Sequence, residues 1–494
     1  MTVGTIAALL DEAAHDCPGK SLLLDTEGGA LTIGDVARLS TAATHWLADA
    51  GLRPGMTVAW QLPTHSSAAV LMLALARTSI VQAPVLHLYR QREVRSALDV
   101  ADADVLIVDD ATAPNAPTGI PVVRLPSDFL EVLRAIPDGP GPSPPPSAGT
   151  PRWIYFTSGT TGRPKGVRHT DVSLLAAVRG YVQHLGLGEH ADEVGTIAFP
   201  IAHIGGILYI ASALIGGFPA VVVPKVDSDL IRLLAENRVT ISGSSTAFYQ
   251  ILLAAQLASG SDTPIIPSLR MLIGGGAPCP PELHHKVRRH MGVPIVHAYG
   301  MTEAPTICVS EASDTEEQQS NSCGRPIPGA EIRIGEGDEI QLRGANMSSG
   351  YVDDDQWSDA TTSDGWFRTG DSGCVRPDGR MVITGRVKDL IIRKGENIAP
   401  DEVENALLAH PLIDEVAVVG QPDELRGEMV CAVVRRSPGR ADVTLDDVCE
   451  FLDQRGLMKQ KWPERLFIVD EFPLTGLGKV AKRQLAEQIS GGAR

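Results

Sequence analysis

Cysteine is scarce in this sequence and is poorly placed for bridges or metal binding. The 494 residues include 7 cysteines, an odd number, and no two of them form a CxxC pair. A disulfide framework needs an even set of cysteines, and a structural zinc site needs closely spaced pairs. The sequence therefore argues against both and predicts reduced thiols in a cytoplasmic protein.

Positive charge is also in short supply. Asp and Glu total 60 against 43 for Lys and Arg, so the formal net charge is −17. Broad surfaces for nucleic acid or anionic membranes need an excess of basic residues, so neither partner is expected, although a local basic funnel for an anionic ligand stays open.

The N-terminal stretch MTVGTIAALLDEAAHD has no basic residue ahead of its apolar run, which argues against a signal peptide.

One stretch, residues 196–224, is long and apolar enough to compete as a membrane span. His203 is its only side chain that can carry a charge near neutral pH. Prolines and glycine pairs interrupt it at positions 200, 205–206, 216–217 and 219. This punctuation predicts a strand, a helix, a Gly-Gly turn and a second strand in an α/β core, and no integral membrane association.

The first third of the chain has the pattern of a parallel α/β sheet. Up to about residue 135, a helical segment such as 33–50 alternates with short apolar runs such as 57–61 and 104–108. Residues 137–151 are so rich in proline and glycine that they predict a surface loop or linker. The α/β pattern then resumes at residue 153.

Two changes of pattern divide the rest of the chain. After residue 311, short strands with dense turn residues predict a small β-rich subdomain. After residue 386, a helix starting near Pro400 and another capped by Thr444 belong to an α+β pattern. Since the length exceeds what one core supports, we expect an α/β protein with two domains. Residues 1–385 form the large N-terminal domain of layered α/β subdomains with the β-rich subdomain, and residues 386–494 form a small α+β C-terminal domain.

The stretch YFTSGTTGRPKGV, residues 155–167, predicts a polyphosphate-binding loop after an apolar strand at 153–157. Its glycines let backbone amides approach an anion, while its hydroxyls and Lys165 add further donors. It is not a Walker A loop, because Lys165 is followed by Gly166 where that motif needs Ser or Thr. The only Gly-Lys-Ser of the chain, residues 19–21, lacks the required first glycine.

Six segments in order resemble the signature motifs of the adenylate-forming (AMP-binding) superfamily. This superfamily includes acyl-CoA synthetases, adenylation domains of peptide synthetases and beetle luciferases. The segments are TSGTTGRPKGV (157–167), GGGAP (274–278), AYGMTE (298–303), WFRTGD (366–371), GRVKDLIIRKGENIAPDEVE (385–404) and LTGLGKV (474–480). On these residues the chain is identified as a member, in the branch of carboxylate–CoA ligases.

The resemblance implies two half-reactions that use ATP, Mg²⁺ and CoA. A carboxylate attacks the α-phosphorus of ATP to give an acyl-adenylate and pyrophosphate, and the CoA thiol then attacks the activated carbonyl. A cation should stabilise the negative charge that develops in the first step, and Lys479 is the matching residue. The resemblance also implies a mobile C-terminal domain, which swings about a hinge at Lys388 and brings Gly395, with room for pantetheine, to the site.

The resemblance further assigns residues to the nucleotide. Asp371 is suited to a ribose diol, Glu303 to magnesium and Thr302 to a phosphate oxygen. With His203 and Lys479, Thr302 and Glu303 are the expected catalytic residues. The residues expected to bind ATP or CoA are Thr157, Ser158, Gly159, Thr160, Thr161, Gly162, Lys165, Gly275, Gly276, Ala277, Pro278, Ala298, Tyr299, Gly300, Asp371, Arg386, Lys388 and Gly395.

The segment FPIAHIGGI, residues 199–207, indicates which class of carboxylic acid the enzyme would activate. Amino-acid-activating relatives carry an aspartate here to hold the substrate ammonium, and this chain has none, so an α-amino acid is not expected. A neutral acyl pocket is predicted from His203, Ile204, Gly205, Gly206, Ile207, Gly274 and Met301, with the glycines leaving room for a sizeable group. Fatty, alicyclic and aryl acids stay open, and His203 is either a structural residue or a gate.

Other interpretations stay open. The same motifs would serve an enzyme that loads a carrier protein's phosphopantetheine, or a catalytically silent nucleotide-binding protein. The oligomeric state stays open, with a homodimer as one alternative. Three histidines, His284, His285 and His290, lie among basic residues that oppose a metal, so they predict a solvated helix face.

Overall fold

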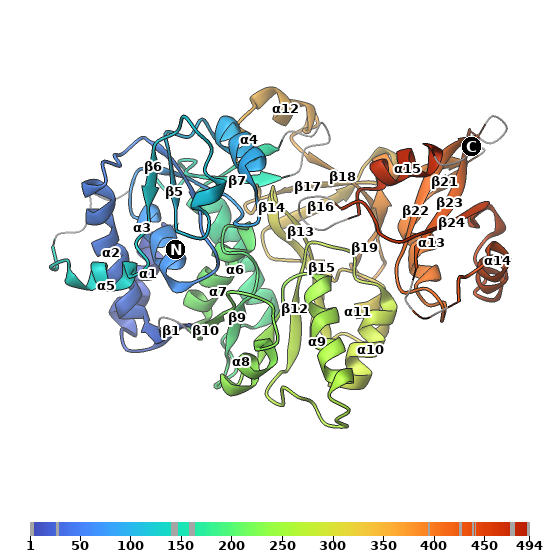
Figure 1. The fold of residues 1–494 in the computed structure, drawn as a ribbon, viewed down its shortest axis with the longest axis horizontal. Coiled ribbons are helices and arrows are strands. Elements are labelled where there is room, and N and C mark those ends of the chain that lie inside the picture. Colours follow the sequence, from blue (N-terminus) through green and yellow to red (C-terminus); the bar gives the residue numbers. More distant parts are fainter. Residues whose placement is uncertain are drawn as a thin grey trace.

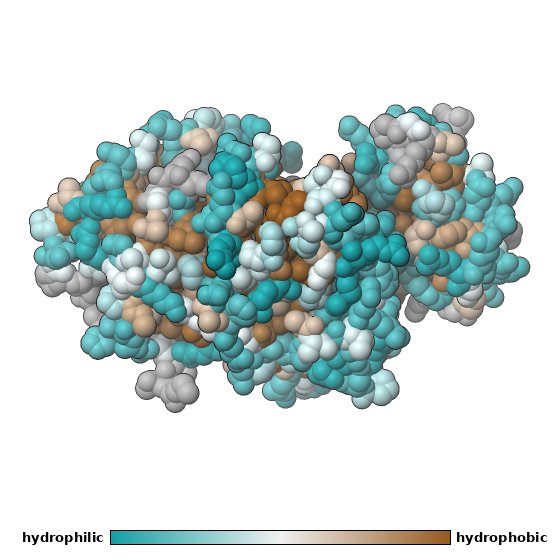
Figure 2. Space-filling model, turned by 90° about the horizontal axis from the view of Figure 1, so that it is seen from below, coloured by the Kyte–Doolittle hydropathy of each residue, from teal (hydrophilic) through white to brown (hydrophobic). Residues whose placement is uncertain are grey.

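The computed structural model describes residues 4–25, 29–139, 147–157, 164–393, 396–423, 427–436, 439, 441–474 and 480–491. A large part runs into strand β19 (Met381–Arg386), and a smaller part begins near the end of that strand (Figure 1). Seen from below, the smaller part is a lobe of its own, with an indentation between it and the large part (Figure 2). None of the helices built from these residues is both long and apolar enough to cross a membrane.

The first sheet of the large part has six strands in the order β6-β5-β3-β4-β7-β8 and is parallel except at β8. Its strands are β3 (Thr57–Gln61), β4 (Val81–Pro84), β5 (Val105–Val108), β6 (Val122–Arg124), β7 (Trp153–Thr157) and β8 (Lys165–His169). The helices of this region are α2 (Ile33–Asp49), α3 (Ser66–Ala76), α4 (Gln91–Ala101) and α5 (Phe129–Ala135). The predicted strands at 57–61 and 153–157 and the helix at 33–50 are confirmed.

Two further sheets complete the α/β region. One is four-stranded, in the order β2-β1-β10-β9, with β1 (Ser21–Asp25), β2 (Gly29–Thr32), β9 (Gly195–Ile197) and β10 (Ala220–Val222). The other is five-stranded, with β11 (Ile241–Ser242), β12 (Met271–Gly275), β13 (Ile295–Met301), β14 (Ala304–Val309) and β15 (Arg325–Pro326) in chain order. Helices α6 (Asp171–Leu185), α8 (Leu230–Glu236), α9 (Thr246–Ala258), α10 (Pro281–Met291) and α11 (Glu316–Ser320) accompany them.

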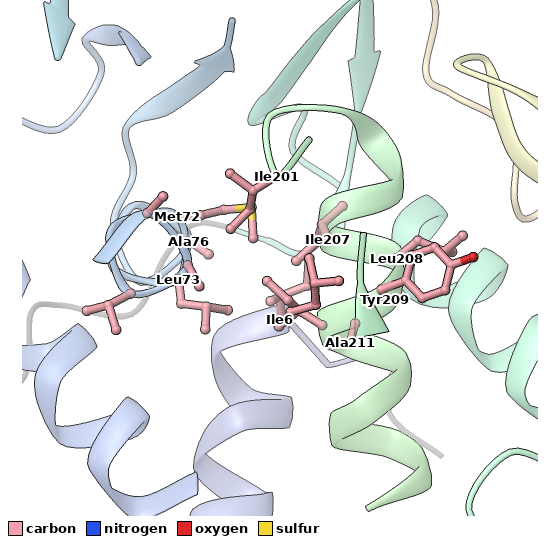
Figure 3. Close-up of a cluster of buried hydrophobic side chains, with 14 of the residues drawn as sticks. Ile6, Met72, Leu73, Ala76, Ile201, Ile207, Leu208, Tyr209 and Ala211 are labelled. Atoms are coloured by element: carbon pink, nitrogen blue, oxygen red, sulfur yellow. The ribbon is translucent and has the colours of Figure 1, made fainter. Parts of the chain in front are cut away.

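The apolar stretch at 196–224 folds as the sequence predicts. Strand β9 leads to helix α7 (Ile204–Gly216), Gly217 caps that helix in the left-handed region at φ +65°, and β10 follows. Side chains of α7 meet those of α3 and of α1 (Ile6–Asp16) in the main hydrophobic core (Figure 3). The stretch is therefore a buried core element.

The β-rich subdomain is a four-stranded antiparallel sheet in chain order. It consists of β16 (Ala330–Ile334), β17 (Glu339–Gly344), β18 (Phe367–Val375) and β19, and the short helix α12 (Asp354–Asp359) lies between β17 and β18 in the chain. Strand β18 carries Asp371 directly opposite Arg386 of β19. The predicted β-rich region is thus present and brings two expected nucleotide ligands together.

The smaller part has its own sheet and two hydrophobic clusters. The strands are β20 (Ile391–Arg393), β21 (Glu396–Ile398), β22 (Val416–Asp423), β23 (Gly427–Arg435) and β24 (Arg465–Val469), and the helices are α13 (Pro400–Leu407), α14 (Leu445–Gln454) and α15 (Lys482–Gly491). Helix α14 begins as expected with Thr444 and Asp447 in a capping box. The predicted α+β pattern is confirmed.

The prediction of a solvated histidine face on α10 is wrong for one residue. His285 is exposed beside Glu316, but His284 is 4% exposed and packs on the inner face of the helix. Burial lowers the pKa of His284 to about 3, so it is neutral. No group of three metal-ligating side chains occurs among the described residues.

Candidate active site

The turn between β13 and β14 places Thr302 and Glu303. Met301 pairs with Ala304 across this turn. The backbone oxygen of Glu303 accepts a hydrogen bond from Ser348 N at 2.7 Å. Nε2 of the buried His169 ring lies 2.7 Å from the backbone oxygen of Thr302. Both residues of the turn are therefore held by neighbouring segments.

Glu303 is a buried carboxylate whose charge lacks a close counter-ion. The residue is 5% exposed, and Oε1 accepts a hydrogen bond from the Tyr351 hydroxyl at 2.6 Å. Among the described residues, no Lys, Arg or His forms an ion pair with it. Burial raises the pKa of Glu303 above its ordinary value, although the Tyr351 hydrogen bond and, to a smaller extent, the charges of Lys165 and Arg386 act in the opposite direction. A bound cation would relieve this cost, so the residue fits a magnesium ligand.

Lys165 stands at the start of β8, and Thr157 ends β7 directly opposite it. The Lys165 Nζ lies 4.6 Å from the centroid of the Tyr351 ring. Lys165 and Glu303 thus contact the same tyrosine from two sides. The loop between the two strands lies outside the described residues, and with it the predicted ligands Ser158, Gly159, Thr160, Thr161 and Gly162.

Asp371 is the second buried carboxylate of the candidate site, after Glu303. It is 6% exposed, its Oδ2 accepts from the Tyr299 hydroxyl at 2.7 Å, and its Oδ1 lies 3.1 Å from Arg386 Nε. Its backbone N–H donates to Thr369 Oγ1 at 3.0 Å. Two predicted nucleotide ligands, Tyr299 and Arg386, therefore both contact a third, Asp371.

The GGGAP segment crosses from β12 into a loop beside β13. Gly274 and Gly275 pair with His297 and Ala298 of the neighbouring strand, and Gly276, Ala277 and Pro278 follow. Gly274 has φ +145°, and a Cβ there would lie 2.1 Å from the Ser244 oxygen. The chain itself requires this glycine, whether or not a ligand does.

Five predicted acyl-pocket residues, at positions 203–207, lie at the start of α7. His203 caps α7, where its Nδ1 accepts from Gly205 N at 3.1 Å, and its ring stacks on Phe199 at 5.2 Å. Further along the helix, the Tyr209 hydroxyl lies 3.5 Å from the oxygen of Ile273, one residue before Gly274. Helix α7 therefore contacts the strand that leads into GGGAP through Tyr209, which is not one of the predicted pocket residues.

Two residues of the predicted pocket also have structural reasons for their identity. A Cβ at Gly206 would lie 2.2 Å from the Ile201 oxygen, so the close approach of the chain requires glycine. Ile207 points into the core near Ile6 and Ile201 (Figure 3). The remaining pocket residues are Ile204, which is buried, and Met301, which is half-buried at the end of β13. Their role as pocket lining stays a prediction.

Two residues that are expected to act from the smaller part lie outside the described residues. These are the catalytic Lys479 and Gly395, which is expected to leave room for pantetheine. Of the expected hinge residue Lys388 only the backbone is described, in a short 3₁₀ turn. Close to Lys479 in the chain, Leu474 forms a β-bridge with Val480. The Lys482 Nζ lies 3.1 Å from Asp401 Oδ1 and 2.8 Å from Glu404 Oε1. These contacts attach α15 to α13.

Tyr351 and His169 were not among the residues singled out from the sequence. Each is a single residue without a periodic pattern, and each reaches the site from a segment remote in the chain. The one available signal was the position of His169 at the end of the strand that starts with Lys165. Tyr351 offered no comparable signal.

Two family profiles match the chain. "AMP-binding enzyme" matches residues 10–352, and "AMP-binding enzyme C-terminal domain" matches residues 402–479. The first match covers most of the chain and includes the glycine-rich loop, Glu303 and Tyr351.

Similar proteins extend this likeness over the whole length. A sulfoacetate–CoA ligase from Cupriavidus necator is 32% identical over 503 aligned residues, covering 97% of each chain. An indoleacetate–CoA ligase from Aromatoleum aromaticum is 36% identical, covering 69% of this chain and 68% of the relative. Among solved structures, ATP-bound MatB from Rhodopseudomonas palustris has a TM-score of 0.86 and 27% identity, covering 98% of each chain.

Proposed function

This chain belongs to the adenylate-forming AMP-binding enzymes, in the branch of the carboxylate–CoA ligases, and we propose that it activates a carboxylic acid without an α-amino group. As an ATP-dependent acid–thiol ligase, it converts the acid and ATP to an acyl-adenylate and pyrophosphate, then the acyl-adenylate and CoA to acyl-CoA and AMP. The observation that supports ATP-dependent activation most directly is that Tyr351 contacts both Lys165 and Glu303, while Tyr299 of β13, the strand that leads to Glu303, holds Asp371.

The large part supplies the groups that bind and orient the nucleotide. Asp371 would accept hydrogen bonds from the ribose diol, while Tyr299 and Arg386 keep its carboxylate in place. Glu303 would hold Mg²⁺, which when bound supplies positive charge for the phosphate oxygens. Lys165 and the Thr302 hydroxyl would contact the phosphates from β8 and from the turn after β13.

The neutral character of the α7 region supports the choice of acid. His203 is the only ionisable side chain between Phe199 and Ile207, so this segment offers no carboxylate to a substrate ammonium. The similar ligases are named for acids that include sulfoacetate, indoleacetate and medium-chain fatty acids. We infer a fatty, alicyclic or aryl acid for this chain, with His203 at the gate of the pocket.

The smaller part supplies the residues that would alternate between the two steps. We propose a boundary between residues 385 and 386, a hinge at Lys388, and a C-terminal domain that presents Lys479 during adenylation and Gly395 during thioester formation. We also propose a cytoplasmic enzyme and leave homodimer formation to measurement.

A panel of acids tests the substrate class. Acid-dependent ATP–pyrophosphate exchange is measured with fatty, alicyclic, aryl and α-amino acids, followed by thioester formation with CoA and with a phosphopantetheinylated carrier protein. We expect simple acids to support exchange, α-amino acids to be the poorest class, and CoA to be the better acceptor. Exchange with an α-amino acid alone would overturn the assignment of the acid, and a strong preference for the carrier protein would overturn that of the acceptor.

Separate assays of the half-reactions test the alternation. Lys479→Ala should lower exchange by roughly 10²–10³-fold, a typical cost of removing one preorganised stabilising group, and should spare thioester formation from a preformed acyl-adenylate. Gly395→Leu should do the converse, because a side chain would obstruct pantetheine. Equal damage to both steps by Lys479→Ala, or loss of exchange in Gly395→Leu, would contradict the alternation.

A further inference from the structure

Tyr351 lies between the two charged groups at the phosphate end of the site. Its hydroxyl donates to Glu303 Oε1 at 2.6 Å, and its ring lies under the Lys165 ammonium at 4.6 Å. The residue is only 3% exposed. One side chain therefore contacts both Glu303, from the turn after β13, and Lys165, from the strand after the glycine-rich loop.

The backbone around Tyr351 is fastened to the strand that carries Lys165. Arg168 N donates to the Gly350 oxygen at 2.8 Å, and Val352 N donates to the Gly166 oxygen at 2.7 Å. Val167 forms a β-bridge with Tyr351 itself. The segment around Tyr351 therefore lies as an additional short strand along β8.

The Tyr351 ring is also fixed by aromatic neighbours. Trp357 meets it edge to face at 5.3 Å between ring centroids, and Phe367 does so at 6.5 Å. Burial and the nearby Glu303 charge raise the pKa of the Tyr351 hydroxyl, so it stays protonated as a donor. The side chain thus has a fixed position and a fixed hydrogen-bonding role.

We propose that Tyr351 is a positioning residue for magnesium-bound ATP, acting on the cation through Glu303 and on the phosphates through Lys165. This proposal rests on the proposed function. The hydroxyl holds the Glu303 carboxylate in one orientation and favours its charged form, whereas the ring face holds the Lys165 ammonium by a cation–π contact. The two contacts use different parts of one side chain, so they can be removed separately.

Two substitutions separate the contacts. Tyr351→Phe removes the hydroxyl and keeps the ring, while Tyr351→Leu removes both. Hydrogen-bonding partners of a metal ligand commonly contribute 10–100-fold to metal affinity. A cation–π contact of a partly solvated ammonium, such as that of the half-buried Lys165, contributes roughly two- to fivefold. Tyr155→Phe is a matched control, because the buried Tyr155 hydroxyl has no hydrogen-bond partner among the described residues.

Calorimetric titration with ATP, first without Mg²⁺ and then across a Mg²⁺ series, is the primary measurement. For Tyr351→Phe we expect the Kd for ATP without Mg²⁺ to lie within about twofold of the wild-type value. Saturating Mg²⁺ should lower this Kd by a factor that is about tenfold or more smaller in the variant than in wild type. Tyr351→Leu should also weaken magnesium-free binding by roughly two- to fivefold, and this extra loss should vanish in a Lys165→Met background. Tyr155→Phe should match wild type in both titrations.

The magnesium dependence of exchange gives an independent readout. Because the hydroxyl orients the proposed magnesium ligand, its loss in Tyr351→Phe should raise the Mg²⁺ concentration for half-maximal exchange by about tenfold and leave the KM for the carboxylic acid unchanged. Wild-type magnesium dependence in both binding and exchange would overturn the hydroxyl's role. If Tyr351→Leu weakens magnesium-free ATP binding just as much in the Lys165→Met background, the ring's role is overturned. A failure of the proposed function is distinguishable, since wild-type protein would then show no acid-dependent exchange while the ATP titrations still decide the role of Tyr351.

Discussion

The two buried carboxylates of the site, Glu303 and Asp371, have similar surroundings with one decisive difference. Each is almost fully buried, and each accepts a hydrogen bond from a tyrosine hydroxyl, at 2.6 Å from Tyr351 and 2.7 Å from Tyr299. Asp371 also lies 3.1 Å from Arg386 Nε. In the part of the chain that the structure describes, Glu303 has no such ion pair.

This difference separates the two tasks of the site. A buried carboxylate without a counter-ion is costly to ionise, so the Glu303 end gains most from an incoming cation. A carboxylate that is already paired retains acceptor capacity without requiring new positive charge, so the Asp371 end suits neutral donors such as hydroxyls. Magnesium is therefore expected at Glu303 and ribose at Asp371.

The largest expected effect comes from Glu303→Gln, which keeps the shape of the side chain and removes its charge. We expect a loss of roughly 10²–10³-fold in acid-dependent ATP–pyrophosphate exchange, the usual scale for removing one preorganised electrostatic group. The measurement is the exchange rate across a Mg²⁺ series at saturating acid. A variant with normal magnesium dependence would show that the cation binds elsewhere.

Asp371→Asn should have the next largest effect, through ATP rather than the cation. Hydrogen bonds to a charged group contribute about 1.5–3 kcal/mol, so kcat/KM for ATP should fall by roughly 10–150-fold. The magnesium concentration for half-maximal rate should not change. If it rises as it does in Glu303→Gln, the two carboxylates do not have separate tasks.

Much of the fold could be predicted because local pattern and tertiary structure agree. Residues 57–61 and 153–157 are short apolar runs and form the strands β3 and β7. The glycines and prolines within 196–224 mark the turns around α7. In such segments, backbone restrictions and hydrophobic periodicity specify the same structure.

The residues that sequence reasoning missed or misplaced depend on contacts between distant segments. His284 has charged neighbours in the chain, yet it lies on the inner face of α10 and is buried. Tyr351 meets Glu303 across 48 residues and Lys165 through a strand pairing with no sequence signature. The glycine at 206 is required by the oxygen of Ile201, a steric constraint that only the folded backbone reveals.

Ligand-free stability gives a smaller but sharper contrast between the carboxylates. Burial raises the folded-state pKa of Glu303. Protonation of this carboxyl therefore contributes fully to the free energy of unfolding at pH values below the unfolded-state pKa. The contribution is lost as the pH rises through the folded-state pKa. At pH values above the folded-state pKa, Glu303→Gln should be more stable than wild type by about 1 kcal/mol. The substitution removes a buried charge that has no ion-pair partner among the described residues. Asp371→Asn should show no gain, because its charge is paired with Arg386.

Thermal unfolding midpoints of ligand-free protein, measured from pH 4.5 to pH 8, check this contrast. The advantage of Glu303→Gln should be near zero at the acid end and should grow with pH. An advantage that is constant with pH would point to packing rather than charge. A gain of the same size in Asp371→Asn would remove the distinction between a paired and an unpaired carboxylate.

The smallest expected effect concerns Arg386, whose side chain is 60% exposed. Solvent screens an ion pair at such a position, so it contributes about 0–1 kcal/mol, and Arg386→Gln should raise the KM for ATP by at most roughly fivefold. Its informative feature is selectivity, since the magnesium dependence should stay at the wild-type value even though the Arg386 charge, which lowers the pKa of Glu303, is lost. The substitution also leaves the Tyr299 hydrogen bond on Asp371, so the double variant Tyr299→Phe/Arg386→Gln should lose more than either single variant. ATP saturation curves at several Mg²⁺ concentrations measure all three variants. A change in magnesium dependence in Arg386→Gln would mean that positive charge at the Asp371 end also controls the cation at the Glu303 end.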